Sequence, residues 1–425
     1  MRNSITIVSL DVHRDSIVGG ALPPDVDVIQ DEKRLAFNLS KLVKWLRRLE
    51  GKWGEIEVIY EAGGCGYVIY RELTSLGIRC LVIAPSLIPI KPGERKKKTD
   101  RNDVRRNALA HRAGNLTMVC VPDQEDEALR SVMRLRRVLV KDKTRSRNQI
   151  CSHLLRHGQV YRAGNNWTTA HWDWLKALSL LLSDEQFSLD RYVEKQQLIE
   201  GQLSEVEHRI RERARTAEHV DRAARVMCLK GLDVIGAMVL TAETGDFLRF
   251  AEAKKYMDWV GLVPGIWQSG ESCKGLGITK AGNSHCRHVL IQAAWSIVRN
   301  HPTASQKLRI RWKGQPAWVL RLSVRAMKRV HHRYWHLIHR GKEKQVAIVA
   351  AARELAGFVW AIMQPPEIAN CRPTERGNRR AGPKTVRHAA FPPEGKGGGK
   401  SSPTPPSADP KAERRTEVGS TELLV

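Results

Sequence analysis

Apolar residues in the first third of the chain fall into short runs separated by polar or glycine-containing segments. Short runs of β-branched and apolar residues bounded by turn-forming residues are typical of buried strands. The pattern predicts strands at residues 5–12, 16–22, 25–30, 55–62, 79–85 and 116–122.

Between these runs, apolar residues recur at steps of three and four, which is the period of an amphipathic helix. This spacing predicts helices at residues 38–50, 66–77, 101–114 and, after the last strand, 126–158. Three strands followed by alternating helices and strands is the order of a mixed α/β domain with a partly parallel sheet. We assign this domain to residues 1–160.

Residues 161–225 are expected to form a helical, coiled-coil linker. Their apolar seam has steps of three and four over about three heptads and is interrupted by one glutamine. It consists of Leu189, Tyr192, Gln196, Ile199, Leu203, Val206 and Ile210. An intramolecular helical hairpin and a dimerisation arm explain this seam equally well. For the preceding Trp167, Trp172 and Trp174, packing between helices is favoured over stacking on nucleobases.

Residues 226–364 are predicted to form a third, mostly helical domain. It opens with Gly231 and Gly236 around a tight turn between two helices, and such a turn can present backbone N–H groups to a phosphate. The motif alone is weak, because glycine-rich turns between helices are common. Residues 365–425 are rich in Pro, Gly, Ser and charge, which predicts a disordered tail.

The charge balance points to a polyanionic partner. Lys plus Arg total 71 against 45 for Asp plus Glu, a formal net charge of +26. Such an excess attracts nucleic acid, although a merely basic soluble protein shares it. No uncharged apolar stretch of about 18 residues occurs, so we expect a cytoplasmic protein with no membrane partner.

Four carboxylates are predicted to converge on one edge of the sheet. Asp11 and Glu61 end two of the strands, and Asp100 and Asp103 lie three residues apart at the start of a helix, on one face of it. Converging carboxylates repel one another unless cations lie between them. All-oxygen ligation suits Mg²⁺ or Mn²⁺, and two such ions could activate a phosphodiester. Each acid alone would more often be a cap or a surface residue.

The helix carrying the two aspartates begins inside a dense basic run. The basic residues around the aspartates are expected to hold a nucleic-acid backbone: Arg95, Lys96, Lys97, Lys98, Arg101, Arg105 and Arg106. Of these, Lys96, Lys97, Lys98 and Arg101 are our candidate nucleic-acid-binding residues. The aspartates would then hold metal, and the basic residues would hold the polyanion against it.

Four stretches together resemble one family. They are "LDVHRDSI", "YEAGGCGYVIYREL", "KTDRND" and "GLVPGIWQSGESCKGLGITKAGN". The chain resembles the DEDD transposases of bacterial insertion sequences, recombinases guided by a bridge RNA, from about residue 5 to about residue 364. The resemblance implies an RNase H-like fold of the RuvC type for the first domain, with the four acids as its catalytic metal ligands, and a serine transposase domain at the C-terminal end.

The resemblance also implies a nucleophilic serine, Ser269 in "WQSGES", that forms a covalent link to DNA. Ser272 competes with it by spacing alone. A serine hydroxyl is a poor nucleophile at neutral pH and needs a base or a metal. The segment that follows fits a loop and helix start that hold the DNA backbone through Lys274, Lys280 and Asn283. The expected partners are DNA, a guide RNA from the element and further copies of the chain, as a dimer or tetramer.

Three functions are compatible with these features. The first is a site-specific recombinase that moves its own element, with sequence choice delegated to RNA pairing. The second is a RuvC-like nuclease or junction resolvase that needs only the acids. The third is a catalytically idle nucleic-acid-binding protein, and the presence of all four acids and Ser269 argues against it.

Overall fold

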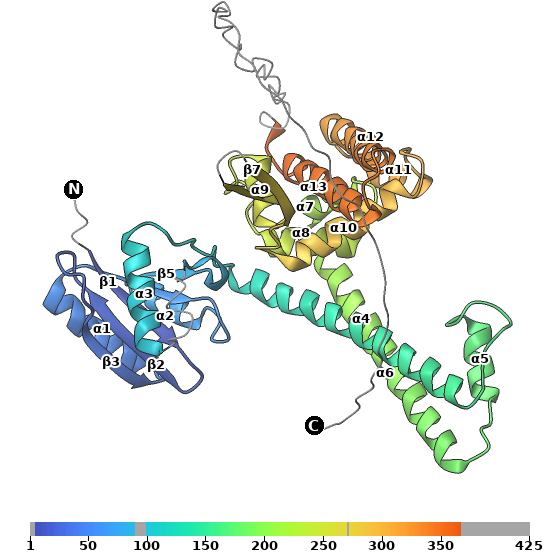
Figure 1. The fold of residues 1–425 in the computed structure, drawn as a ribbon, viewed down its shortest axis with the longest axis horizontal. Helices are drawn as coiled ribbons and strands as arrows, with labels where there is room; N and C mark the ends of the chain where they lie inside the picture. The colour runs from blue at the N-terminus through green and yellow to red at the C-terminus, as the bar shows by residue number, and fades with distance from the viewer. Residues whose placement is uncertain (1–4, 90–98, 270–271, 367–425) are drawn as a thin grey trace, which may run out of the picture. The chain divides into compact units, whose positions relative to one another are not determined.

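The first part of the chain forms a five-stranded mixed sheet in the order β3-β2-β1-β4-β5 (Figure 1). The computed structural model describes residues 5–89, 99–269 and 272–366. The strands are β1 (Thr6–Val12), β2 (Ser16–Leu22), β3 (Gln30–Ala36), β4 (Ile56–Glu61) and β5 (Arg79–Ile83). β4 lies parallel to both β1 and β5, whereas β2 pairs antiparallel with β1 and with β3. The expected mixed α/β sheet is confirmed.

Helices cover both faces of this sheet. Side chains alternate between the faces of a strand, so Val8 and Leu10 of β1 pack with the helices α1 (Leu39–Trp53) and α2 (Val68–Ser75). Ile7 and Ile59 point to the other face, where they pack with Ala108 of α3 (Asp100–Arg112). Asp11 and Glu61 continue the Ile7 and Ile59 rows, so both acids belong to the α3 face.

The prediction of a strand at residues 25–30 is wrong. The third strand is β3, at Gln30–Ala36, and residues 23–29 form an irregular loop. Arg112 holds this loop by donating hydrogen bonds to the backbone oxygens of Leu22, Pro23 and Val26. β3 is an edge strand with mostly exposed or half-exposed side chains, so it does not need the apolar run that marks a buried strand.

The segment at residues 116–122 also differs from the prediction of a sixth strand. It makes only an isolated antiparallel bridge between Ile83 and Met118. Two backbone hydrogen bonds accompany it, from Ala84 N to Thr117 O and from Val119 N to Val82 O. Val119 and Val121 still pack against the sheet core, which explains the apolar pattern without a strand. A 3₁₀ turn at Pro85–Leu87 follows β5.

The long helix α4 (Gln124–Arg156) pairs with α6 (Ser183–Arg213) as an antiparallel hairpin (Figure 1). The ion pairs between the helices are Arg136 with Glu207, Arg147 with Glu200 and His157 with Glu185. Residue numbers rise along α4 as they fall along α6, so the two helices are antiparallel. The seam of α6 therefore packs inside one chain, as the hairpin interpretation expected, and a coiled-coil arm between chains is not confirmed.

The helix α5 (Thr169–Ala177) lies in the connection between α4 and α6 and packs on that end of the hairpin. Trp167, Trp172 and Trp174 pack around a small core with Ile150 and Leu189. The packing interpretation of these tryptophans is the one the structure supports.

The rest of the described chain is mostly helical, with one β-hairpin. The elements are α7 (Val220–Met227), α8 (Val234–Thr244), α9 (Ala253–Trp259), β6 (Pro264–Ser269), β7 (Ser272–Ile278), α10 (Ser284–Val298), α11 (Gln306–Trp312), α12 (Ala317–His339) and α13 (Lys344–Ile362). Leu129 and Met133 of α4 and Ile210 of α6 belong to the same hydrophobic core as α7 to α13.

α13 is long and apolar enough to cross a membrane by length and composition. Its apolar face, including Ala351, Leu355 and Val359, is buried in the core against other helices, as in the central helix of a folded domain. The predicted disordered tail lies almost entirely outside the described residues, which end at 366.

Candidate active site at the strand ends

Asp11 and Glu61 lie side by side at the carboxyl ends of two parallel strands. β1 and β4 are paired in a register that sets Leu10 opposite Tyr60, and the next residue on each strand is an acid. Neighbouring strands are about 4.8 Å apart, so the two carboxylates share one edge of the sheet. The two strands are thus neighbours in the sheet, as convergence of the acids requires.

The other two acids occupy the first turn of α3. Thr99 caps the helix, because its side-chain oxygen accepts a hydrogen bond from Asn102 N. Acidic residues in a first turn are favoured by the helix dipole, which helps to explain why the helix begins here. α3 packs across β1 and β2, and this packing brings Asp100 and Asp103 to the strand ends. We call Asp11, Glu61, Asp100 and Asp103 the acid cluster.

His13 lies between two members of the acid cluster. Its Nε2 is 3.3 Å from Asp11 Oδ2 and 3.3 Å from Asp100 Oδ1. These three side chains offer ligand atoms within 4.8 Å of one another, a spacing that could hold a metal ion. Sequence reasoning missed His13, although it follows Asp11 by two residues.

Arg106 connects the other two members, and Asn107 contacts one of them. Arg106 Nη1 is 2.6 Å from Asp103 Oδ1, and its Nη2 is 3.6 Å from Glu61 Oε1. Asn107 Nδ2 donates a 2.9 Å hydrogen bond to Glu61 Oε1. Asp103 is only 5 % exposed, and Arg106 meets its Oδ1 as an ion pair outside hydrogen-bonding geometry. The sequence patterns did not identify Asn107, and placed Arg106 only among the surrounding basic residues.

The electrostatics of Asp11 reflect this crowding. Burial raises the pKa of its carboxyl above the ordinary value of 3.8, the charge of His13 lowers it, and the charges of Asp100, Asp103 and Glu61 raise it again. The charges of the other three acids therefore oppose ionisation of Asp11, and a bound cation would offset this repulsion.

Ser269 is the last residue of β6, at the tip of the β6–β7 hairpin, where its backbone pairs with Ser272. Residues 270–271 lie outside the described chain, as do the side chains of Ile266, Gln268, Ser269, Ser272, Cys273 and Lys274. We expected a loop before the helix start, and the structure corrects this in part, since Lys274 belongs to β7. Sequence reasoning also did not recognise residues 264–269 as a strand.

Close backbone contacts fix the base of this hairpin. Gly282 has φ +125°, and a Cβ there would lie 2.0 Å from Trp259 O. Gly261 has φ +75°, and a Cβ there would lie 2.6 Å from Ala281 O. Thr279 N also donates to Val263 O. The segment that carries Ser269 thus begins and ends at positions that only glycine fills without strain.

Asn283 has a structural task at the end of this segment. Its Oδ1 caps α10 by accepting hydrogen bonds from His285 N and Cys286 N, and its Nδ2 donates to Glu243 Oε2. Glu243, only 2 % exposed, also receives two hydrogen bonds from Arg134. The amide predicted to bind nucleic acid is therefore engaged within the protein.

The other predicted nucleic-acid contacts fall in different settings. Lys96, Lys97 and Lys98 lie outside the described residues. Arg101 is largely exposed in the first turn of α3, with its Nε 3.3 Å from Glu32 Oε2. Lys280 is exposed in the loop before α10, with φ +54°. Lys274 is placed in β7 by its backbone alone.

A mixed sheet of this order, with acids at its carboxyl edge and α3 across it, is consistent with the RNase H-like class of nucleic-acid enzymes. Residues 8–158 match the sequence model of a DEDD transposase family, described as "Transposase". Residues 223–309 match a second model, described as "Transposase IS116/IS110/IS902 family".

Similar proteins carry the same description. "Putative transposase y4qE" of Sinorhizobium fredii is 37 % identical over 321 residues, covering 75 % of this chain and 77 % of the relative. The transposase of insertion sequence IS1533 from Leptospira borgpetersenii is 29 % identical, covering 78 % and 96 %. That of IS1111A from Coxiella burnetii is 25 % identical, covering 74 % and 79 %. The chain belongs to the IS110/IS116 family of DEDD transposases, enzymes that cleave and transfer DNA.

Proposed function

We propose that this transposase moves its own insertion sequence by cutting and rejoining DNA with the acid cluster and Ser269 acting together, under the guidance of an RNA. The convergence of Asp11, Glu61, Asp100 and Asp103 is the observation that carries the proposal. The family membership supplies the substrate, DNA.

The acid cluster fits a divalent cation. Its ligand atoms are carboxylate oxygens, with His13 Nε2 beside two of them, and hard cations such as Mg²⁺ and Mn²⁺ prefer oxygen ligands. Asp11, Asp100, Asp103 and Glu61 would hold the ion, with His13 orienting Asp11 and Asp100. A bound divalent ion supplies neutralisation of the charge that develops on the phosphodiester oxygens. The ion pairs of Arg106 with Glu61 and Asp103 would keep these two carboxylates in place.

Ser269 is proposed as the nucleophile. Its Oγ forms a bond to the phosphorus of a DNA phosphodiester while the bond from phosphorus to the leaving strand oxygen breaks. The serine proton passes to a base, and the leaving oxygen accepts a proton, so the strand ends as a free hydroxyl. Attack of a strand hydroxyl on the serine phosphodiester reverses these steps and rejoins DNA.

RNA guidance and assembly of several copies belong to the same proposal. The net charge of +26 gives the protein the capacity to bind RNA as well as DNA. A site composed of an acid cluster and a separate hairpin serine can be completed between subunits, which would prevent cutting before assembly.

A nuclease or junction resolvase without a covalent serine step is the second candidate. The acid cluster lies wholly within the sheet domain, and it contains everything that metal-assisted hydrolysis needs. This candidate differs from the first only in the attacking group, which would be water.

An adduct assay separates the two candidates. Purified protein is mixed with donor and target DNA, the RNA from the element's flanking region and Mg²⁺, and protein–DNA adducts are resolved on a denaturing gel. We expect an adduct with the wild type. Ser269→Ala should abolish it, because the attacking oxygen is lost. Asp11→Asn should reduce it by at least about 10²-fold, because the cation loses a ligand.

The outcomes are distinct. Strand cutting without an adduct in wild type and Ser269→Ala, abolished by Asp11→Asn, would establish the nuclease. An undiminished adduct in Ser269→Ala with loss in Ser272→Ala would move the nucleophile to Ser272. Ribonuclease treatment that leaves site-specific cutting unchanged would exclude RNA guidance.

A further inference from the structure

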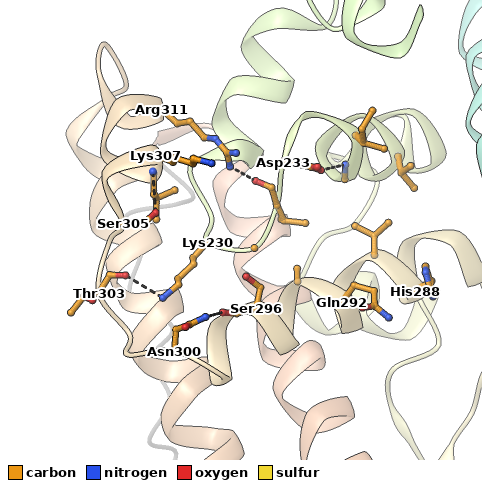
Figure 2. Close-up of a pocket in the computed structure, with 18 of the residues that line it drawn as sticks. Lys230, Asp233, His288, Gln292, Ser296, Asn300, Thr303, Ser305, Lys307 and Arg311 are labelled. Carbon is orange, nitrogen blue, oxygen red and sulfur yellow. Dashed lines mark hydrogen bonds between the residues drawn. The ribbon is translucent and has the colours of Figure 1, made fainter. Parts of the chain in front are cut away.

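A pocket of about 760 Å³ lies where the turn between α7 and α8 meets α10 and α11 (Figure 2). We call it the turn pocket. Lys230, Gly231 and Asp233 of the turn line it. The turn pocket therefore contains the glycine motif, which has no role in the function proposed above. Gly231 itself is required for packing, because it has φ +87° and a Cβ there would lie 2.4 Å from Ala293 O.

Three cations line the turn pocket without a carboxylate at ion-pair distance among the described residues: Lys230, Lys307 and Arg311. Lys230 Nζ donates to the carbonyl oxygens of His301 (2.7 Å) and Thr303 (3.2 Å), which fixes its position and leaves one N–H donor. Arg311 Nη1 donates to Leu232 O (2.8 Å) and retains its other donors. Lys307 is exposed. Hydrogen bonds to backbone oxygens thus hold Lys230 and Arg311 in place without neutralising their charges.

A row of uncharged polar side chains on α10 lines the opposite wall. His288, Gln292 and Ser296 follow one another at four-residue steps, which places them on one helix face. All three are exposed, and Figure 2 labels them in order along α10. Such groups can hydrogen-bond sugar or base atoms beside a bound phosphate.

Asp233 is the one acid among the described residues that line the turn pocket, and its carboxylate caps α8. Its Oδ1 accepts a 2.8 Å hydrogen bond from Gly236 N at the start of α8. Lys230, Lys307 and Arg311 outnumber this single acid in the lining, so the turn pocket carries a net positive charge.

We propose that the turn pocket binds the phosphodiester backbone of a nucleic-acid strand, separately from the acid cluster. Lys230, Lys307 and Arg311 contact phosphate oxygens, and Gln292 and Ser296 contact the adjoining sugar or base. The site anchors nucleic acid on the helical region and takes no part in bond cleavage. It does not depend on Ser269 or on RNA guidance, since the strand can be DNA or RNA.

Binding measurements in EDTA test this site without catalysis. Full-length protein is titrated into labelled single-stranded DNA, duplex DNA and single-stranded RNA of matched sequence, and anisotropy is followed over a range of salt. The variants are Lys307→Glu and Gln292→Glu, both exposed and outside the core. Lys176→Glu, an exposed residue on α5 with the same charge change as Lys307→Glu, is the control.

We expect Lys307→Glu to weaken binding about tenfold at low salt and to reduce the salt slope by about one. Gln292→Glu should weaken binding severalfold, and Lys176→Glu by less than about twofold. The arm that loses affinity identifies DNA or RNA as the strand. Equal loss in Lys176→Glu, or unchanged binding in all three arms, would overturn the proposal. Labelled poly-glutamate is titrated in the same way as a non-nucleic polyanion. If Lys307→Glu loses poly-glutamate binding and keeps oligonucleotide binding, the pocket belongs to an acidic peptide instead.

Discussion

His13 and Arg106 divide the acid cluster into two pairs. His13 lies between Asp11 and Asp100, whereas Arg106 lies between Glu61 and Asp103. The carboxylates could be predicted from strand ends and from helical spacing, because these set the positions of backbone atoms. Their partners could not, because His13 and Arg106 are selected by side-chain reach across elements that the sequence does not place in contact.

Asp11→Asn should stabilise the metal-free protein at neutral pH by about 0.5–2 kcal/mol, because it removes a charge that burial and three neighbouring acids oppose. The folded pKa of Asp11 lies above the ordinary 3.8. Its protonated form therefore stabilises the fold at low pH, and this contribution is lost as pH rises through the folded pKa. Thermal unfolding in EDTA across that range measures both effects.

Asp15→Asn is the matched control, since Asp15 is 90 % exposed in its side chain and lies outside the acid cluster. It should change the unfolding free energy little at any pH. Mg²⁺ should raise the melting temperature of wild type and Asp15→Asn more than that of Asp11→Asn. An Asp11→Asn variant less stable than wild type in EDTA would contradict this account.

Among the elements, those that bury an apolar face were predictable and those at edges were not. α1 (Leu39–Trp53) and β4 (Ile56–Glu61) follow the periodic pattern because each packs on the sheet core. β3 is polar because it is an edge strand. Residues 116–122 are apolar because Val119 and Val121 pack against the sheet core, although only an isolated bridge joins this segment to β5. The β6–β7 hairpin was hidden by its many glycines and polar residues.

The α4–α6 hairpin should lose about 1–3 kcal/mol of stability in Glu207→Gln. Burial raises the pKa of Glu207, but hydrogen bonds and charges from Arg136 and Arg211 outweigh it and hold the pKa below the ordinary 4.5. The ionised form therefore stabilises the fold above about pH 4.5, and this stability is lost as pH falls through the folded pKa. Urea unfolding at neutral and acidic pH measures the difference.

Glu194→Gln makes the same change on the same helix at a residue paired only with Arg191 on an exposed face. Its effect should stay below about 0.5 kcal/mol. Equal losses in the two variants would show that the partly exposed ion pairs of Glu207 stabilise the hairpin no more than a fully exposed pair does.

For the whole molecule, the net charge of +26 predicts binding to DNA and RNA that weakens steeply with salt. If the protein contacts about six to ten phosphates, affinity should fall by about 10³ to 10⁵ between about 50 and about 200 mM salt. Equilibrium anisotropy in EDTA measures the slope. Affinity that stays constant over this range would mean that contacts other than phosphate dominate.

The packing of α4 determines where the chain can be divided for expression. α4 begins just after the sheet, yet Leu129 and Met133 complete the core of α7 to α13, and its later turns complete the core with α5 and α6. A recombinant fragment ending near residue 160 would carry α4 with these apolar residues uncovered, and should aggregate. A division just before Asp123 leaves α4 with the helices that bury it, so soluble halves should come from that boundary.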